Sequence, residues 1–139
     1  MRRSTARYAA HTKVPVRRSL DERRSLDEIE RTVTRYGADA FGHLRADGKT
    51  KVQFRKDGRT VRFEMPIDPD PKQERQKWRA LLPGIKARLE NTASGIETFE
   101  ESFFAHIVMP DGRTVYETAR EPLALAYERG GNVPLLPAG

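Results

Sequence analysis

Histidine and carboxylate side chains are the groups of this chain that could perform acid–base chemistry. Asp111 follows His106 by five residues, so its carboxylate could orient an imidazole that acts as a general base. His11 and His43 lie too far away in the sequence for a spacing argument to join them to this pair. No nucleophile motif, glycine-rich phosphate loop or run of metal ligands accompanies His106. The sequence therefore predicts that the protein is not an enzyme and carries no cofactor or metal.

Two further carboxylates, Asp68 and Asp70, could be imagined as Mg²⁺ ligands. Prolines flank them, however, and a proline directly after Asp70 is typical of the first turn of a helix, so Asp70 is expected to be a helix N-cap. The chain contains no cysteine, which excludes disulfides, thiolate metal sites and a cysteine nucleophile. Metal or redox chemistry is therefore not what this sequence predicts.

Lysine and arginine offer a different chemistry, the binding of phosphate groups. The formal net charge of +6 divides into +10 over residues 1–91 and −4 over residues 92–139. The basic part suits a polyanion such as nucleic acid, and the acidic remainder equally suits a second copy packed acidic end to basic end. The candidate nucleic-acid-binding residues are Lys49, Lys51, Arg55, Lys56, Arg59 and Arg62, with Arg17 and Arg18 upstream.

Two Asp-Gly turns position most of these cations. Asp47-Gly48 and Asp57-Gly58 separate runs of alternating apolar and polar residues, which is a strong hairpin signal. They predict a three-stranded antiparallel meander over residues 38–65. Two-residue loops would give the meander one apolar face and one solvent-exposed, mostly basic face. A longer first loop would move Phe41 and His43 to the basic face. With the short loops, the apolar face carries Phe41, His43, Val52, Phe54, Val61, Phe63 and Met65.

The segments around the meander predict a single domain of the α+β class. Residues 1–16 contain no acidic residue and show no periodicity, so they are expected to form a disordered basic arm, although such a start also resembles an organelle transit peptide. Residues 17–130 are expected to form the domain: a helix, the antiparallel meander, then helices packed on one sheet face. Residues 131–139 form the predicted tail.

The first helix is predicted from an exact duplication. Residues 17–22 repeat as residues 23–28, and each repeat contains a capping box. Because six residues are not a whole number of helical turns, the two leucines of the repeats cannot share one stripe. The packed helix is therefore expected to begin near Ser25, with the first repeat as an extension.

Three more helices are expected after the meander. The helix over residues 72–91 has an apolar stripe that begins at Trp78, and Pro83 predicts a kink or break within it. A short apolar helix is expected between Thr98 and Val108, with Thr98 and Glu101 as its capping box. The last helix, over residues 114–127, is expected to be capped by Thr114 with Glu117 and to be interrupted at Pro122.

The short helix carries more apolar surface than a small core requires. Phe103 and Phe104 are neighbours, so their rings widen the apolar stripe. The excess could bury a partner, which makes these two residues the candidate protein-binding residues and a homo-oligomer the expected state.

Four strings of residues resemble a family of small uncharacterised phage and prophage proteins. They are Trp78-Arg-Ala-Leu-Leu82, Ile85-Lys-Ala-Arg-Leu-Glu90, Gly95-Ile-Glu-Thr-Phe-Glu-Glu101 and Ala105-His-Ile-Val-Met-Pro-Asp-Gly-Arg-Thr-Val115. With upstream matches within residues 14–38 and over residues 58–63, the resemblance covers about four fifths of the chain. It implies a phage context and no particular activity. The chain departs from the family pattern at the duplication and at Pro83-Gly84.

Two functions follow as hypotheses. The first is a phage-derived nucleic-acid-binding accessory protein, acting in replication, recombination or regulation through the basic sheet face and the arm. The second is a non-enzymatic interaction module that docks on a host or virion protein as an oligomer. In both cases the expected location is the cytoplasm of a bacterial host, without a membrane partner, because no apolar run is long enough to span a bilayer.

Overall fold

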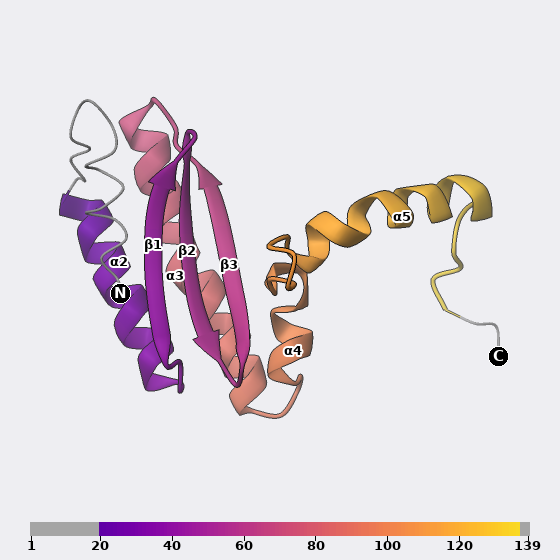
Figure 1. Ribbon diagram of the computed structural model, residues 1–139, viewed down its shortest axis with the longest axis horizontal. Coiled ribbons are helices and arrows are strands. Elements are labelled where there is room, and N and C mark those ends of the chain that lie inside the picture. Colours follow the sequence, from indigo (N-terminus) through magenta and orange to yellow (C-terminus); the bar gives the residue numbers. More distant parts are fainter. Residues whose placement is uncertain (1–19, 137–139) are drawn as a thin grey trace.

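The computed structural model describes residues 20–136 and confirms the predicted α+β order of helix, three-stranded meander and helices (Figure 1). The predicted arm over residues 1–16, together with Arg17 and Arg18, lies outside the described residues. The elements are α2 (Leu20–Arg35), β1 (Ala40–Ala46), β2 (Lys49–Lys56), β3 (Arg59–Pro66), α3 (Pro71–Ala93), α4 (Phe99–Ser102), a 3₁₀ turn η1 (Phe104–His106) and α5 (Val115–Gly130).

The sheet has the register that the two Asp-Gly turns predict. Phe41 pairs with Phe54 and His43 with Val52, so the first loop has two residues and both side chains lie on the core face. Asp47 and Asp57 have φ of 54° and 52°, and the glycines that follow also have positive φ. Positive φ at both central residues defines the I′ turn, whose twist matches that of the paired strands.

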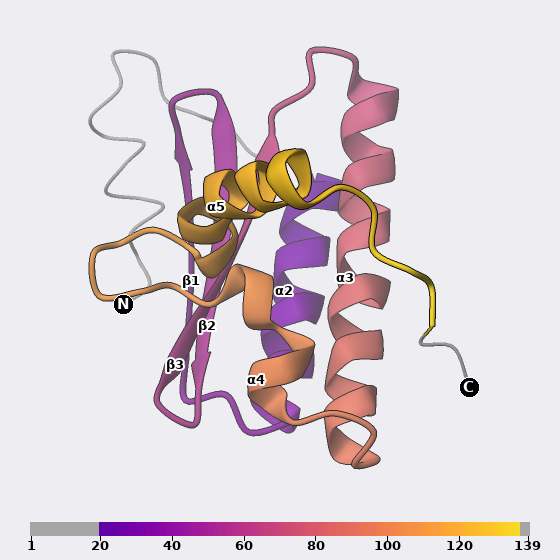
Figure 2. The same ribbon diagram turned by 90° about the vertical axis from the view of Figure 1, so that its right-hand side faces the viewer.

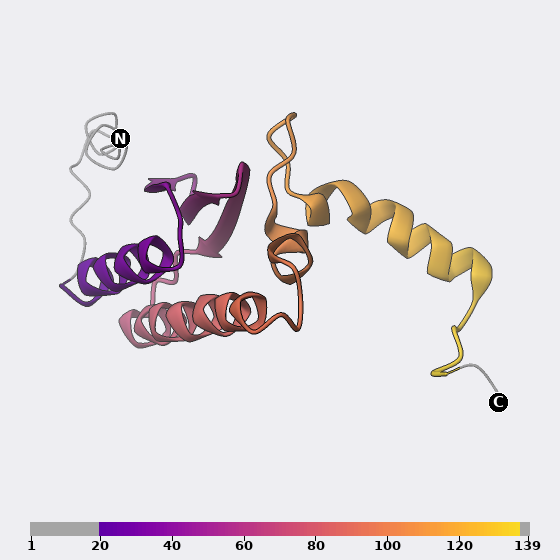
Figure 3. The same cartoon turned by 90° about the horizontal axis from the view of Figure 1, so that it is seen from below.

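Helices α2 and α3 cover one face of the sheet, as Figure 3 shows from below. The core between these layers contains Leu26, Ile29, Val33, Val52, Phe54, Val61, Phe63, Trp78, Ile85 and Leu89. Trp78 is 2% exposed and donates from Nε1 to Glu74 at 3.1 Å, so it is the core anchor that the apolar stripe predicts. The opposite sheet face carries the alternate residues of each strand, as the two-residue period of a strand requires.

Helix α2 already begins at Leu20, so the expected start of the packed helix near Ser25 is wrong. The first repeat contributes Glu22, which lies on the same stripe as Leu26, Ile29 and Val33 and is 3% exposed. Arg45 of β1 donates to its carboxylate at 2.9 Å. Residues 20–22 of the first repeat are therefore part of the packed helix, through an ion pair of Glu22 that an apolar pattern does not reveal.

Helix α3 runs unbroken through Pro83, so of the predicted kink or break the break is absent. The proline lies on the exposed side of the helix, where water can reach the carbonyl group that loses its hydrogen bond. Asp70 is the N-cap, accepting a hydrogen bond from the backbone N–H of Lys72 at 3.0 Å.

The predicted helix from Thr98 to Val108 is wrong in its second half. The Thr98 capping box starts α4 as expected, but the helix ends at Ser102 and continues only as the η1 turn. Ile107 then forms a β-bridge with Val61, and the Val108 N–H donates to the carbonyl of Thr60 at 2.8 Å. Ile107 and Val108 thus cover part of the free edge of β3 instead of continuing the helix.

Helix α5 begins at a second capping box, formed by Thr114 and Glu117, and ends at Gly130, with Gly131 as its C-cap at a φ of 74°. It passes through Pro122 without the expected interruption. Figure 1 shows α5 extending away from the sheet and its two covering helices, and in Figure 2 it points toward the viewer. Only its first turn lies against the rest of the described chain, beside η1.

Candidate interaction surfaces

The predicted basic row on the sheet is largely neutralised by acidic neighbours. Among the described residues, five of its six cations lie within ion-pair distance of a carboxylate. Lys51 is the member without such a partner in this part of the chain. The pairs are Lys49 with Glu64, Arg55 with Asp39, Lys56 with Asp57, Arg59 with Glu100, and Arg62 with Glu64 and Glu117.

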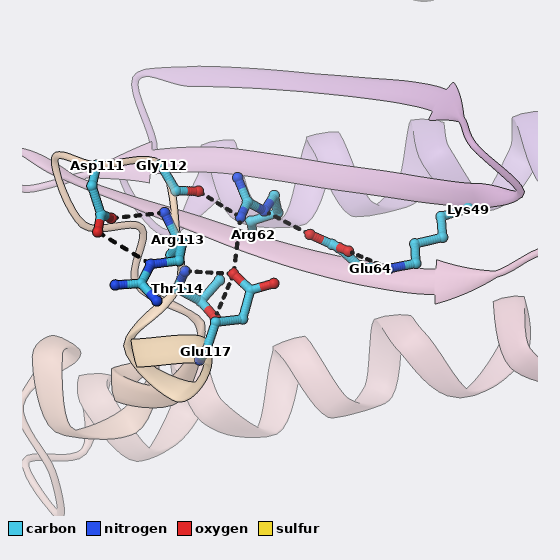
Figure 4. Close-up of polar contacts among 8 residues, drawn as sticks. All are labelled: Lys49, Arg62, Glu64, Asp111, Gly112, Arg113, Thr114 and Glu117. Carbon is cyan, nitrogen blue, oxygen red and sulfur yellow. Dashed lines mark hydrogen bonds and ion pairs between the residues drawn. The ribbon is translucent and has the colours of Figure 1, made fainter. Parts of the chain in front are cut away.

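Arg62 is the clearest departure from the predicted row, since its side chain is only 12% exposed (Figure 4). It donates to the carbonyl oxygen of Gly112 at 2.8 Å and lies 3.4 Å from the Glu117 carboxylate. Its Nε is 3.0 Å from Glu64. Arg62 therefore joins β3 to the turn before α5 and to the first turn of α5, and it is not available to a phosphate group without breaking these contacts.

Glu117 has two tasks at this junction. It accepts from the Thr114 backbone N–H at 2.8 Å, and this hydrogen bond is the main reason why the pKa of the Glu117 carboxyl is lowered. The nearby guanidinium of Arg62 lowers that pKa further. The charged carboxylate thus both caps α5 and connects it to the sheet.

Unpaired cations are found instead on the solvent face of α3. Lys72, Arg75, Arg79 and Lys86 are exposed and fall on one side of the helix, and within the described chain no carboxylate pairs with them. The stripe is about 21 Å long, from 14 residues at about 1.5 Å each. It is the stronger positive surface of the two, although the sheet row was the one predicted from the sequence.

The proposed pairing of His106 with Asp111 is not formed. Asp111 is exposed, and its carboxylate accepts hydrogen bonds from the backbone and side chain of Arg113 at 3.0 and 3.2 Å, which lower the pKa of Asp111. The His106 ring stacks on Phe63, with ring centroids 4.2 Å apart. Burial, and to a smaller extent the charge of Arg88, lower the pKa of His106, whereas a hydrogen bond with the Arg62 backbone raises it. His106 thus lacks the orienting carboxylate that the spacing suggested.

The two candidate partner-binding phenylalanines lie in different environments. Phe103 is fully buried and meets the rings of Phe54 and Phe63 edge-on, at centroid distances of 5.5 and 6.3 Å. It is a core residue, which corrects its predicted role in partner binding. Phe104 is 55% exposed and remains available to a partner.

A groove of about 470 Å³ opens where α5 leaves the body of the protein. It lies between β3, η1 and the first two turns of α5, and both acidic and basic side chains line it. The residues are Arg62, Glu64, Ala105, His106, Thr114, Tyr116, Glu117 and Arg120. Groups of three or more potential metal ligands are absent from the described part of the chain, here as elsewhere.

Helix α5 itself carries several uncovered apolar side chains on one face. Tyr116, Leu123 and Tyr127 lie on one face at i, i+7 and i+11 and are 57%, 56% and 54% exposed. Ala119 and Ala126 complete the stripe, and Glu117, Glu121 and Glu128 lie on the other side of the helix. The same spacing is visible in the sequence, but the sequence pattern does not indicate that the face is uncovered.

Comparisons with protein-family models, with curated proteins and with solved structures find no match to this chain. No described helix is both long and apolar enough to cross a bilayer. The described chain thus offers two surfaces to a partner, the apolar face of α5 and the cationic stripe of α3.

Proposed function

We propose that this protein is a non-enzymatic interaction module that docks on a partner protein through the apolar face of α5. One observation carries the proposal: Tyr116, Leu123 and Tyr127 share a face of a helix that the rest of the described chain leaves uncovered. An amphipathic helix ordinarily buries such a face, since burying one leucine side chain contributes about 1.5–3 kcal/mol.

The energetics of α5 support the same proposal. Isolated helices shorter than about 12–15 residues are marginal in water, and an interior proline costs about 3 kcal/mol. Helix α5 is only slightly longer than this limit, with 16 residues, and it contains Pro122. Its side chains are exposed from Tyr116 onward, so contacts with its own chain do not offset these costs. Contacts with a partner would supply the stabilisation that this helix does not obtain from its own chain.

Affinity capture on the immobilised full chain tests this function. Leu123→Glu places a charge in the apolar stripe, whereas Leu125→Glu places the same charge on another face of the same helix. We expect the wild type and Leu125→Glu to retain the same bound proteins, and Leu123→Glu to lose them. If all three chains retain the same set, α5 is not the docking element.

Nucleic-acid binding is the second candidate, favoured by the unpaired stripe Lys72, Arg75, Arg79 and Lys86 on α3. Phosphate contacts by this stripe should make affinity fall with salt, with a slope of roughly −0.9 per contact on duplex DNA. Fluorescence anisotropy on single- and double-stranded oligonucleotides at two salt concentrations measures this slope. Arg79→Glu with Lys86→Glu should abolish binding, and Arg55→Glu with Arg59→Glu should weaken it less.

Equal losses from the two double variants would instead favour the sheet row as the phosphate site. An absence of binding at low salt for both kinds of oligonucleotide would remove this candidate. The resemblance of residues 78–115 to phage proteins implies that either function is exercised in the cytoplasm of a bacterial host.

A further inference from the structure

We infer that the partner of α5 is α5 of a second copy of this chain, packed antiparallel to it. This inference rests on the proposed docking role of α5 and specifies its occupant. The residues at the centre of the apolar face are Tyr116, Ala119, Leu123 and Ala126, which recur at i, i+3, i+7 and i+10 and are all exposed. This is the seam of two neighbouring heptads, the spacing by which helices pair side by side.

The alternation of large and small residues in this seam selects the antiparallel direction. With two antiparallel helices, Tyr116 faces Ala126 of the second copy, and Ala119 faces its Leu123. Every layer then combines one large and one small side chain, as close packing requires. In a parallel pair each residue would face itself, so that the layer of two tyrosines would hold the helices apart and leave the alanine layers unfilled.

The charges of α5 are compatible with the same pairing. Glu117, Glu121 and Glu128 lie away from the seam and would remain in solvent. Arg120 flanks the seam one residue from the centre of the pair, so the Arg120 side chains of the two copies would lie near each other at its rim, where both stay exposed and salt screens their repulsion. The acidic side chains of α5 do not face one another across the seam.

The groove at the base of α5 extends the interface. The body of each copy lies at the N-terminal end of its α5, so antiparallel helices keep the two bodies at opposite ends of a pair about 24 Å long (Figure 1). The C-terminal end of the second α5 would arrive where the groove of about 470 Å³ opens beside Tyr116 and His106. Residues 131–136 follow that end, and their Leu135 and Leu136 side chains are 98% and 80% exposed.

Light scattering on the full chain tests the self-association. The wild type should have twice the mass of one chain, Leu123→Glu the mass of one chain, and Leu125→Glu again twice that mass. The thermal unfolding of the body, followed by the fluorescence of Trp78, should be similar in the two variants, which shows that Leu123→Glu acts on the association. A wild type that stays monomeric, or a Leu125→Glu variant that also dissociates, overturns the inference.

Cysteine cross-linking tests the register, because the chain has no cysteine of its own. Ala126→Cys alone should form few disulfide dimers, whereas a mixture of Ala126→Cys and Tyr116→Cys chains should form them readily. Efficient cross-linking of Ala126→Cys alone would mean a parallel pair and overturn the antiparallel assignment.

The failure of this inference can be distinguished from failure of the docking role. A monomeric wild type that captures a different protein, and loses it on Leu123→Glu, overturns the pairing of two copies and leaves α5 as a docking element. A monomeric wild type whose captured proteins do not respond to Leu123→Glu overturns both.

Discussion

Truncation of Phe103 tests most sharply whether this residue belongs to the core or to a binding surface. Its ring is fully buried and lies 5.0–6.3 Å, centroid to centroid, from the rings of Phe54, Phe63 and Phe99. Replacing a buried phenylalanine by alanine costs about 3–5 kcal/mol, from lost transfer free energy and from the cavity that remains. The contacts with three rings place Phe103→Ala toward the upper part of that range.

The matched control is its neighbour, since Phe104 is 55% exposed. Surface substitutions usually change stability by no more than about 0.5 kcal/mol, so Phe104→Ala should leave the free energy of unfolding almost unchanged. Urea unfolding followed by the fluorescence of Trp78, the only tryptophan, measures both variants. For an m-value of about 2 kcal/mol per M, Phe103→Ala should lower the midpoint by roughly 2 M.

Equal shifts for the two variants, or a loss below about 1 kcal/mol for Phe103→Ala, would refute the assignment of Phe103 to the core. If Phe103→Ala does not fold at all, Phe103→Leu retains part of the volume and should show an intermediate loss. The comparison with Phe104→Ala then still decides between the two roles.

Three further outcomes follow from the structure. Glu22→Gln leaves the largely buried Arg45 guanidinium without a charged partner and should lower the free energy of unfolding by about 3 kcal/mol, measured in urea. Because the pKa of His106 is lowered below its ordinary value of 6.5, the folded state binds a proton less readily than the unfolded chain. Stability should therefore fall as the pH drops below 6.5, and an NMR titration of His106 with a midpoint at or above 6.5 would contradict this. Gly58→Ala places a side chain at φ of 75° in the second turn and should cost about 1 kcal/mol, whereas thermal unfolding unchanged from the wild type would argue against the strained turn.

The meander could be predicted from the sequence because its signals are local. Each Asp-Gly pair fixes a two-residue turn, and the turn then fixes the register and the residues of each face. The helix caps at Asp70, Thr98 and Thr114 are equally local and were predicted at the correct residues.

Contacts between distant segments explain the predictions that were wrong. The apolar run from Phe99 to Val108 is as compatible with one long helix as with the short helix observed. The bridge between Ile107 and Val61 is the distant contact that the run does not reveal. The partners of Arg62 lie 50 and 55 residues away, at Gly112 and Glu117, so no spacing rule reveals that this cation is engaged.

The uncovered face of α5 belongs to the same class of features. Its amphipathic spacing is present in the sequence, but most amphipathic helices cover a core of their own chain. The positions of β3, η1 and the turn over residues 110–112 direct α5 away from the body, and its own amphipathic pattern does not encode them.

Amide hydrogen exchange along α5 tests the docking role of this helix most directly, with Leu123→Glu compared against Leu125→Glu. If a partner covers the apolar face, amides of residues 119–130 should exchange slowly in the wild type and in Leu125→Glu. In Leu123→Glu they should exchange at nearly the rate of an unstructured peptide, while the amides of β2 stay protected in all three chains. Slow exchange of residues 119–130 in all three chains would contradict the account, because α5 would then be stable without any cover on that face.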